Sequence, residues 1–112
     1  MTRTRDFPDE AYCPYFQQTM ELIGKRWTAS ILRALFAGAT RFSEIARTVP
    51  GLSNRLLTQR LHELIEAGIV VPVPGIPHGT YQLTEKGEDL RGIFAQLEAW
   101  NARWEDREAS PA

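Results

Sequence analysis

The segment 52–68 is typical of a single amphipathic helix with both of its ends marked. Ser53 can begin this helix, because a serine hydroxyl accepts a hydrogen bond from a free N–H group two or three residues further on. Gly68 can end it, because glycine adopts the left-handed conformation that follows a last helical turn. The apolar residues fall on one face at helical spacing, at Leu57, Leu61, Leu64 and Ile65.

The opposite face of this helix is polar and carries no carboxylate in its first half. Arginine pairs with guanine and glutamine with adenine in the major groove of DNA, so we expect Arg55 and Gln59 to contact base edges. Contacts to the phosphate backbone are expected from Arg41, Ser53, Asn54, Thr58, Arg60 and His62. The alternative for each of these side chains is an exposed polar residue without a partner.

Charge is distributed unevenly along the chain, although the formal net charge is only −1. Seven basic residues and one acidic residue, Glu44, lie between positions 24 and 62. The remainder of the chain holds 6 basic and 13 acidic residues. Such an uneven distribution of charge favours an oriented approach to a polyanion. The alternative is that these arginines are merely solvated side chains on amphipathic helices. The basic window, positions 24–62, includes most of the helix predicted at 52–68, whose polar side chains suit the major groove. This overlap favours DNA as the partner.

Three shorter helices are expected before the helix at 52–68. The first begins with Pro14, because proline is favoured at the first helical position. Two more are expected over about 27–36 and 43–48. Only a few residues, including Pro50 and Gly51, separate the last of these from the helix that follows. Helices joined so tightly cross at a large angle, as in a helix-turn-helix.

A β-hairpin is expected directly after the helix predicted at 52–68. The segments 69–71 and 80–83 are rich in β-favouring residues. Between them lie the turn-forming residues Pro72, Pro74, Gly75, Pro77 and Gly79. A hairpin in this place is the wing of a winged helix. Thr84 then caps a last long helix, expected over about 85–106.

The chain is therefore expected to be one mainly α-helical domain with a small β-hairpin wing, a winged helix-turn-helix. Its 112 residues suit a single domain, and no apolar run approaches the roughly 20 residues that span a bilayer. We expect a flexible arm at 1–12, the folded domain at 13–106 and a tail at 107–112. The compartment expected is the cytoplasm, with no membrane partner.

The last predicted helix carries an apolar seam suited to a partner helix. Ile93, Leu97, Trp100 and Trp104 are spaced by four, three and four residues. We expect the partner to be a second copy of this chain, with Phe16 and Met20 of the first helix contributing to the interface. The alternative is that the seam packs only within the monomer.

Cys13 is the single cysteine, so no disulfide can form within the chain. It lies at the start of a predicted helix, a position that favours the reactive thiolate form of cysteine. Cys13 is therefore a candidate redox sensor, and the alternative is an inert, half-buried thiol. No metal site or cofactor is expected, because the two histidines are not accompanied by the further ligands that a metal ion needs.

Several motifs occur in the order and at the distances of a known family. They are Cys13-Pro14, Glu21-Leu22-Ile23-Gly24-Lys25-Arg26-Trp27-Thr28, Ile31-Leu32-Arg33-Ala34-Leu35, Arg41-Phe42-Ser43-Glu44-Ile45, Pro50-Gly51-Leu52-Ser53, Leu57-Thr58-Gln59-Arg60-Leu61, Glu66-Ala67-Gly68 and Tyr81-Gln82-Leu83-Thr84-Glu85-Lys86-Gly87. From Cys13 to Trp104 the chain resembles the HxlR family of bacterial winged-helix regulators. This resemblance implies a dimeric, MarR-like transcription factor that binds a palindromic operator and responds to electrophiles, oxidants or small molecules. Some relatives sense quinones, aldehydes or hypochlorite through a cysteine at the place of Cys13.

The wing departs from the family pattern. The segment 72–79 is shorter than usual, and its tip, Ile76-Pro77-His78-Gly79, lacks the arginine common there. His78 can still donate a hydrogen bond to a phosphate, although it adds no permanent charge at neutral pH.

The function expected is sequence-specific DNA binding by a homodimer, with an electrophile or small molecule as effector. The alternative is a winged-helix adaptor that binds a protein through its acidic last helix and binds no DNA. An enzyme with Cys13 as nucleophile is not expected, because neither histidine lies close to it in sequence.

Overall fold

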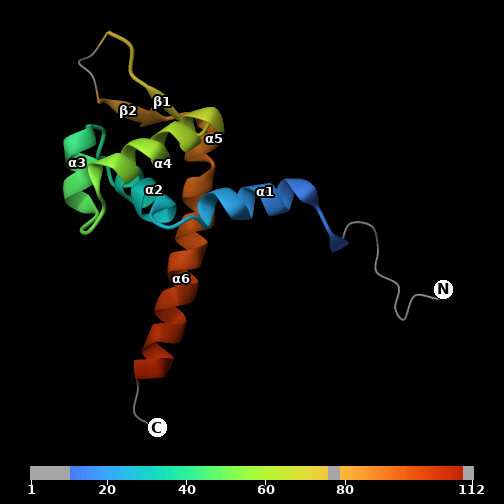
Figure 1. Ribbon diagram of the computed structural model, residues 1–112. Helices are drawn as coiled ribbons and strands as arrows, with labels where there is room; N and C mark the ends of the chain where they lie inside the picture. The colour runs from blue at the N-terminus through green and yellow to red at the C-terminus, as the bar shows by residue number, and fades with distance from the viewer. Residues whose placement is uncertain (1–10, 76–78, 110–112) are drawn as a thin grey trace, which may run out of the picture.

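The computed structural model describes residues 11–75 and 79–109. The elements in chain order are α1 (Pro14–Ile23), α2 (Thr28–Phe36), α3 (Phe42–Thr48), α4 (Asn54–Glu66), β1 (Val70–Pro72), β2 (Tyr81–Leu83), α5 (Glu85–Glu88) and α6 (Leu90–Ala109). Figure 1 shows α2, α3 and α4 gathered into one body, with the hairpin along one side of it. The helices α1 and α6 leave this body in different directions.

The core lies among α2, α3 and α4. All three helices and β1 contribute fully buried apolar side chains: Ile31, Leu32, Ile45, Leu57, Leu61, Leu64 and Val70. The first turns of α6 close it, because the ring of Phe94 packs edge-on against Phe36 with centroids 5.3 Å apart. The predicted apolar face of α4 is confirmed, with Ile65 half-buried at its margin.

The hairpin confirms the predicted wing. The strands β1 and β2 are antiparallel, and Val70 pairs with Leu83. The base of the wing is also tied to the start of α3, since the amide of Tyr81 donates to the carbonyl of Thr40 at 2.7 Å. Arg41 and Thr80 form a further β-bridge beside that bond. The predicted contact residue His78 lies outside the described residues.

The last helix is divided, where the sequence predicted one continuous helix. Thr84 caps the four-residue α5 by accepting from the amide of Gly87 at 3.1 Å, and α6 begins only at Leu90. Between them, Asp89 keeps a right-handed helical backbone (φ −62°, ψ −24°), so the break is local. Contacts with the end of α4 hold α5 in place, because the Thr84 hydroxyl donates to the carbonyl of Gly68 at 2.5 Å.

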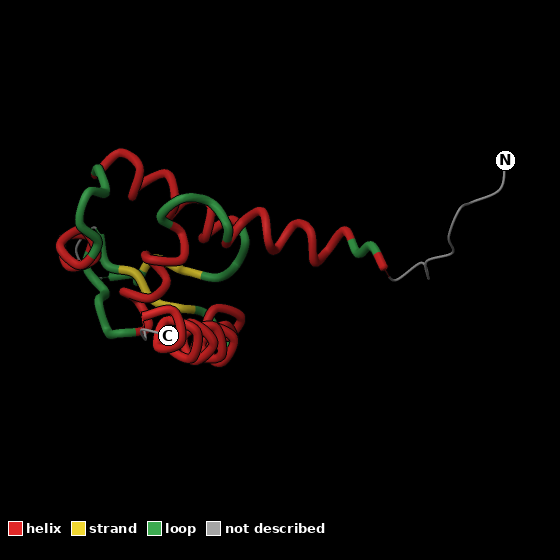
Figure 2. The backbone as a smooth tube through the Cα atoms, turned by 90° about the horizontal axis from the view of Figure 1, so that it is seen from below, coloured by secondary structure: helices red, strands yellow, loops and turns green. Residues whose placement is uncertain are grey.

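The helix α1 stands apart from the core. None of its residues is buried, and only Leu22 and Ile23 at its end pack against the core. Figure 2, in which α6 is seen nearly end-on, shows α1 extending away from the body. In the described part of the chain, no helix is both long enough and apolar enough to cross a membrane.

Gly87 brings α5 close to Ile69, the residue before β1, and its replacement by alanine tests that packing. A Cβ atom added there would lie 2.2 Å from the carbonyl oxygen of Ile69, which the amide of Thr84 already holds at 3.0 Å. Gly87→Ala is therefore expected to lower the free energy of unfolding by about 1–3 kcal/mol. Urea denaturation followed by circular dichroism measures it.

The matched control is Gly92→Ala in α6. An added Cβ at Gly92 meets nothing within 4 Å. This variant should gain about 0.5–1 kcal/mol, because alanine favours helix more than glycine does. Equal stability of the two variants would contradict the packing described for α5.

Candidate nucleic-acid interface

The start of α4 is built as the sequence predicted. The turn before it contains Gly51 at φ +87°, a conformation that favours glycine. Ser53 has an extended backbone, and its hydroxyl accepts a hydrogen bond from the amide of Leu56 at 3.1 Å. The first turn of α4 contains no acidic residue. Its remaining free N–H groups therefore present partial positive charge to the solvent.

The polar face of α4 is exposed because the opposite face fills the core. The exposed side chains on and beside this face are Asn54, Arg55, Thr58, Gln59 and His62. The Thr58 hydroxyl donates to the carbonyl of Asn54 at 2.9 Å, which leaves its oxygen able to accept. Arg55 takes part in none of the ion pairs found among the described residues. The structure thus brings five of the predicted contact residues to one solvent-facing surface.

Arg60, which the sequence predicted to contact phosphate, does not lie on this surface. Only 13% of its side chain is exposed. Its Nε donates to the backbone carbonyl of Arg26 at 3.0 Å, and its guanidinium lies 3.3 Å from the carboxylate of Glu63. Arg60 therefore faces the loop between α1 and α2, and we leave it out of the candidate interface.

Glu63 completes this internal network. Its carboxylate also accepts from Nζ of Lys25 at 3.1 Å. Partial burial of Glu63 opposes its ionisation, but the hydrogen bond from Lys25 and the charges of Arg60 and Lys25 outweigh it and hold the pKa of Glu63 below its usual range. The network therefore joins α4 to the loop before α2 through an ionised carboxylate.

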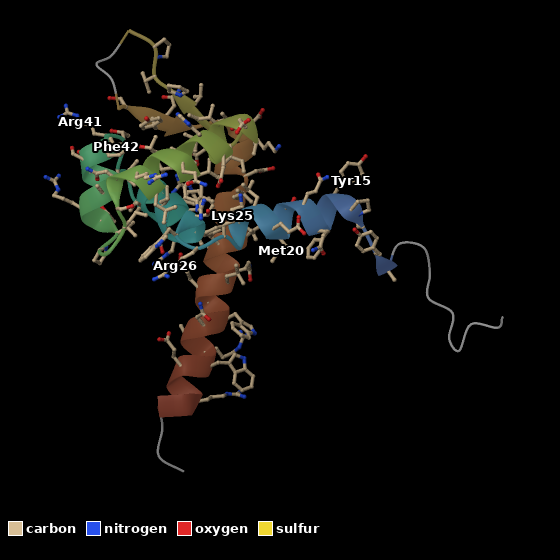
Figure 3. All side chains as sticks on the ribbon, in the orientation of Figure 1. Tyr15, Met20, Lys25, Arg26, Arg41 and Phe42 are labelled. Carbon is tan, nitrogen blue, oxygen red and sulfur yellow. The ribbon has the colours of Figure 1, made fainter. Side chains whose placement is uncertain are left out.

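Arg41 lies exposed at the start of α3, next to the base of the wing. In Figure 3 its side chain extends away from the body, on the side remote from α1. The nearby carboxylate of Glu44 accepts from the amides of Arg41 and Thr40, both at 3.0 Å. These backbone hydrogen bonds hold the pKa of Glu44 below its usual range. The single acidic residue of the basic window is thus used to cap α3.

Arg47 is a surface cation to which sequence reasoning gave no role beyond its charge. It is exposed in the last turn of α3 and joins none of the ion pairs in the described ranges. The sequence signal that could have identified Arg47 was its position at the end of the helix before the α3–α4 turn. Arg41 and Arg47 therefore flank α3 at its two ends.

The residues predicted for a dimer interface are exposed in the single chain. They are Phe16, Met20, Ile93, Leu97, Trp100 and Trp104, with 41–66% of each residue accessible. Three of them, Ile93, Leu97 and Trp100, line a shallow hollow of about 460 Å³ on α6. Cys13 is also exposed and has an extended backbone immediately before α1. In the described ranges, no group of histidine, cysteine, aspartate and glutamate residues is arranged to hold a metal.

The sequence of this chain is similar to those of known helix-turn-helix proteins. The model of the HxlR-like helix-turn-helix family matches residues 22–109. The HTH-type transcriptional regulator YodB of Bacillus subtilis is 39% identical over 95 residues, covering 79% of this chain and 81% of that protein. The uncharacterized regulator YvaP of the same organism is 39% identical over 97 residues, covering 84% and 90%.

Two solved structures are also similar to the fold of this chain. Quinone-bound YodB from B. subtilis superposes with a TM-score of 0.73 at 37% identity, covering 82% of this chain and 99% of that chain. The redox regulator HypR in its reduced form superposes with a TM-score of 0.75 at 30% identity, covering 87% and 99%.

Proposed function

Because the chain belongs to the HxlR-like helix-turn-helix family of transcriptional regulators, we propose that it binds a palindromic DNA operator as a homodimer. The observation that carries this proposal is the exposed polar face of α4, which is capped at its start and held outward by a buried apolar face. A protein of this kind acts in the bacterial cytoplasm, where its operator lies.

In this proposal α4 enters the major groove. Arg55 lies in the first turn and Gln59 one turn later on the same exposed face, so both reach base edges from one helix. The side chains of Ser53, Asn54, Thr58 and His62 contact phosphates, assisted by the free N–H groups at the start of α4. Arg41 and Arg47 add backbone contacts from the two ends of α3. His78 in the wing remains a predicted phosphate contact.

The second copy of the chain is proposed to cover the exposed apolar residues of α1 and α6. Leaving Phe16, Ile93, Trp100 and the other exposed apolar residues of these helices in water is unfavourable, and an exposed apolar surface such as that along α6 marks an interaction site. A two-fold dimer repeats the same patch on both subunits. It also places two α4 helices for half-sites about 34 Å apart, one turn of DNA.

Cys13 is proposed as the site at which an electrophile acts. It is exposed at the start of α1, beside residues of the proposed dimer interface. The similarity to YodB solved with bound quinone, and to a protein described as a redox regulator, supports this role. The thiolate would add to a quinone ring carbon, forming a C–S bond, and protonation then gives the hydroquinone thioether.

The second candidate function is a protein–protein adaptor that uses the acidic segment formed by α5 and α6. Duplex binding that weakens steeply with rising salt is expected of a DNA-binding regulator, because phosphate contacts release counterions. An adaptor would bind no duplex at any salt concentration.

Arg55→Ala tests whether α4 recognises the base sequence of DNA. On an operator selected from random duplex, the variant should lose about 1–3 kcal/mol of binding free energy and relax its preference at one base step. Fluorescence anisotropy on a panel of single-base operator variants measures both. Arg33→Ala, which removes an exposed cation paired with Glu98 on the body, is the control and should bind normally. Unchanged affinity of Arg55→Ala across the whole panel would refute the assignment.

Trp100→Glu tests the dimer. Wild-type protein should sediment with twice the 12.7 kDa chain mass. The variant should sediment as a monomer, because a carboxylate at the centre of an apolar interface loses its hydration. Ala102→Glu is the control, since residue 102 lies on the opposite side of α6 and should leave the dimer intact. A monomeric wild-type protein would show that the apolar patch serves another purpose.

Treatment with methyl-p-benzoquinone tests Cys13. Intact mass should show one adduct per chain, and the operator affinity of the modified protein should change. Cys13→Ser should gain no adduct at that position and keep its affinity under the same treatment. The sensing role fails if fully alkylated wild-type protein binds its operator as the untreated protein does.

A further inference from the structure

The loop between α1 and α2 holds a backbone conformation that needs support. Trp27 has φ +80°, and it is the single non-glycine residue with a positive φ in the described ranges. Such a conformation persists only where surrounding contacts over-determine it. Figure 3 places Lys25 and Arg26 of this loop where α1 joins the body.

The first support lies at the start of α4. The indole of Trp27 packs over the α3–α4 turn, with its Cη2 atom 3.4 Å from the point where a Cβ of Gly51 would lie. The guanidinium of Arg26 stacks on the same indole, 4.9 Å from the ring centroid. The loop is thereby fixed against the turn from which α4 begins.

The second support lies in the middle of α4 and depends on Arg60. One of its nitrogen atoms donates to the carbonyl of Arg26 at 3.0 Å, and another lies 3.3 Å from Glu63. Glu63 in turn holds Lys25 at 3.1 Å. The guanidinium of Arg60 is thus shared between the loop and α4.

These contacts matter because α1 is otherwise attached to the core only through Leu22 and Ile23 at its end. It has no buried residue, and its exposed side chains Phe16 and Met20 belong to the proposed dimer interface. We propose that Arg60 is a positioning residue that sets the orientation of α4 relative to α1 and does not contact DNA. The consequence for operator binding rests on the proposed function, whereas the orientation itself does not.

Electron paramagnetic resonance measures the orientation directly. Nitroxide labels are placed on native Cys13, just before α1, and on Arg55→Cys in the first turn of α4. Labelled chain is diluted with excess unlabelled Cys13→Ser protein, so that distances within one chain are recorded in a monomer or a dimer. The parent protein should give one narrow distance distribution. Arg60→Met should broaden or shift it, and Arg60→Lys should do so less, because lysine keeps the charge without the planar fork.

Two further variants control this experiment. Arg33→Met breaks the exposed Arg33–Glu98 pair between α2 and α6 and should leave the distribution unchanged. Glu63→Gln removes the carboxylate charge with little change of shape and should broaden the distribution, which keeps the test decisive if Arg60→Met does not fold. A parent-like distribution in folded Arg60→Met, or in Glu63→Gln when Arg60→Met is unfolded, would overturn the proposal.

The operator supplies an independent measurement. Loss of one phosphate contact lowers the salt dependence of binding by about one unit of slope. Arg60→Met should instead weaken operator binding by roughly 2- to 30-fold with an unchanged slope, because orientation is lost and every phosphate contact is retained. A slope reduced by about one would assign Arg60 to the DNA contact surface and overturn the proposal. Absence of duplex binding by wild-type protein would refute the proposed function and leave the distance measurement to decide the role of Arg60.

Discussion

Burial of one face of α4 is the interaction on which the rest of the structure depends. Leu57, Leu61 and Leu64 are inaccessible to solvent against the core residues of α2 and α3. A helix with one apolar stripe has a single favourable rotation about its axis, so this burial also fixes which side chains face outward. The wing and α5 then attach to the end of the same helix. The exposed polar surface is therefore a consequence of core packing.

Much of this arrangement follows from local patterns. The cap at Ser53, the end of α4 near Gly68, and the β-favouring runs around the turn-forming prolines all act over a few residues. Such signals are read without knowledge of the tertiary structure. The winged helix-turn-helix and five of the exposed residues of α4 were predictable for this reason. Their roles on DNA remain proposals, because exposure does not identify a partner.

The features missed by sequence reasoning depend on contacts between distant segments. Arg60 was predicted to contact phosphate, but its partner Arg26 lies 34 positions earlier in the chain. The break between α5 and α6 was also missed, and Thr84 at the start of α5 contacts Gly68, 16 positions earlier in the chain. Trp27, whose φ is positive, likewise has its indole against Gly51 in the α3–α4 turn. Helical periodicity specifies a face within one helix, and it carries no information on which neighbouring loop will occupy the margin of that face.

The isolation of α1 has a consequence for how such a protein is controlled. A helix of ten residues is marginal in water unless tertiary contacts hold it, and this one buries none of its residues within the chain. If a second chain covers it, ordering of this segment and assembly become one event, governed by mass action. The abundance of the protein in the cell then acts as an input signal of its own, beside any chemical that reaches the thiol.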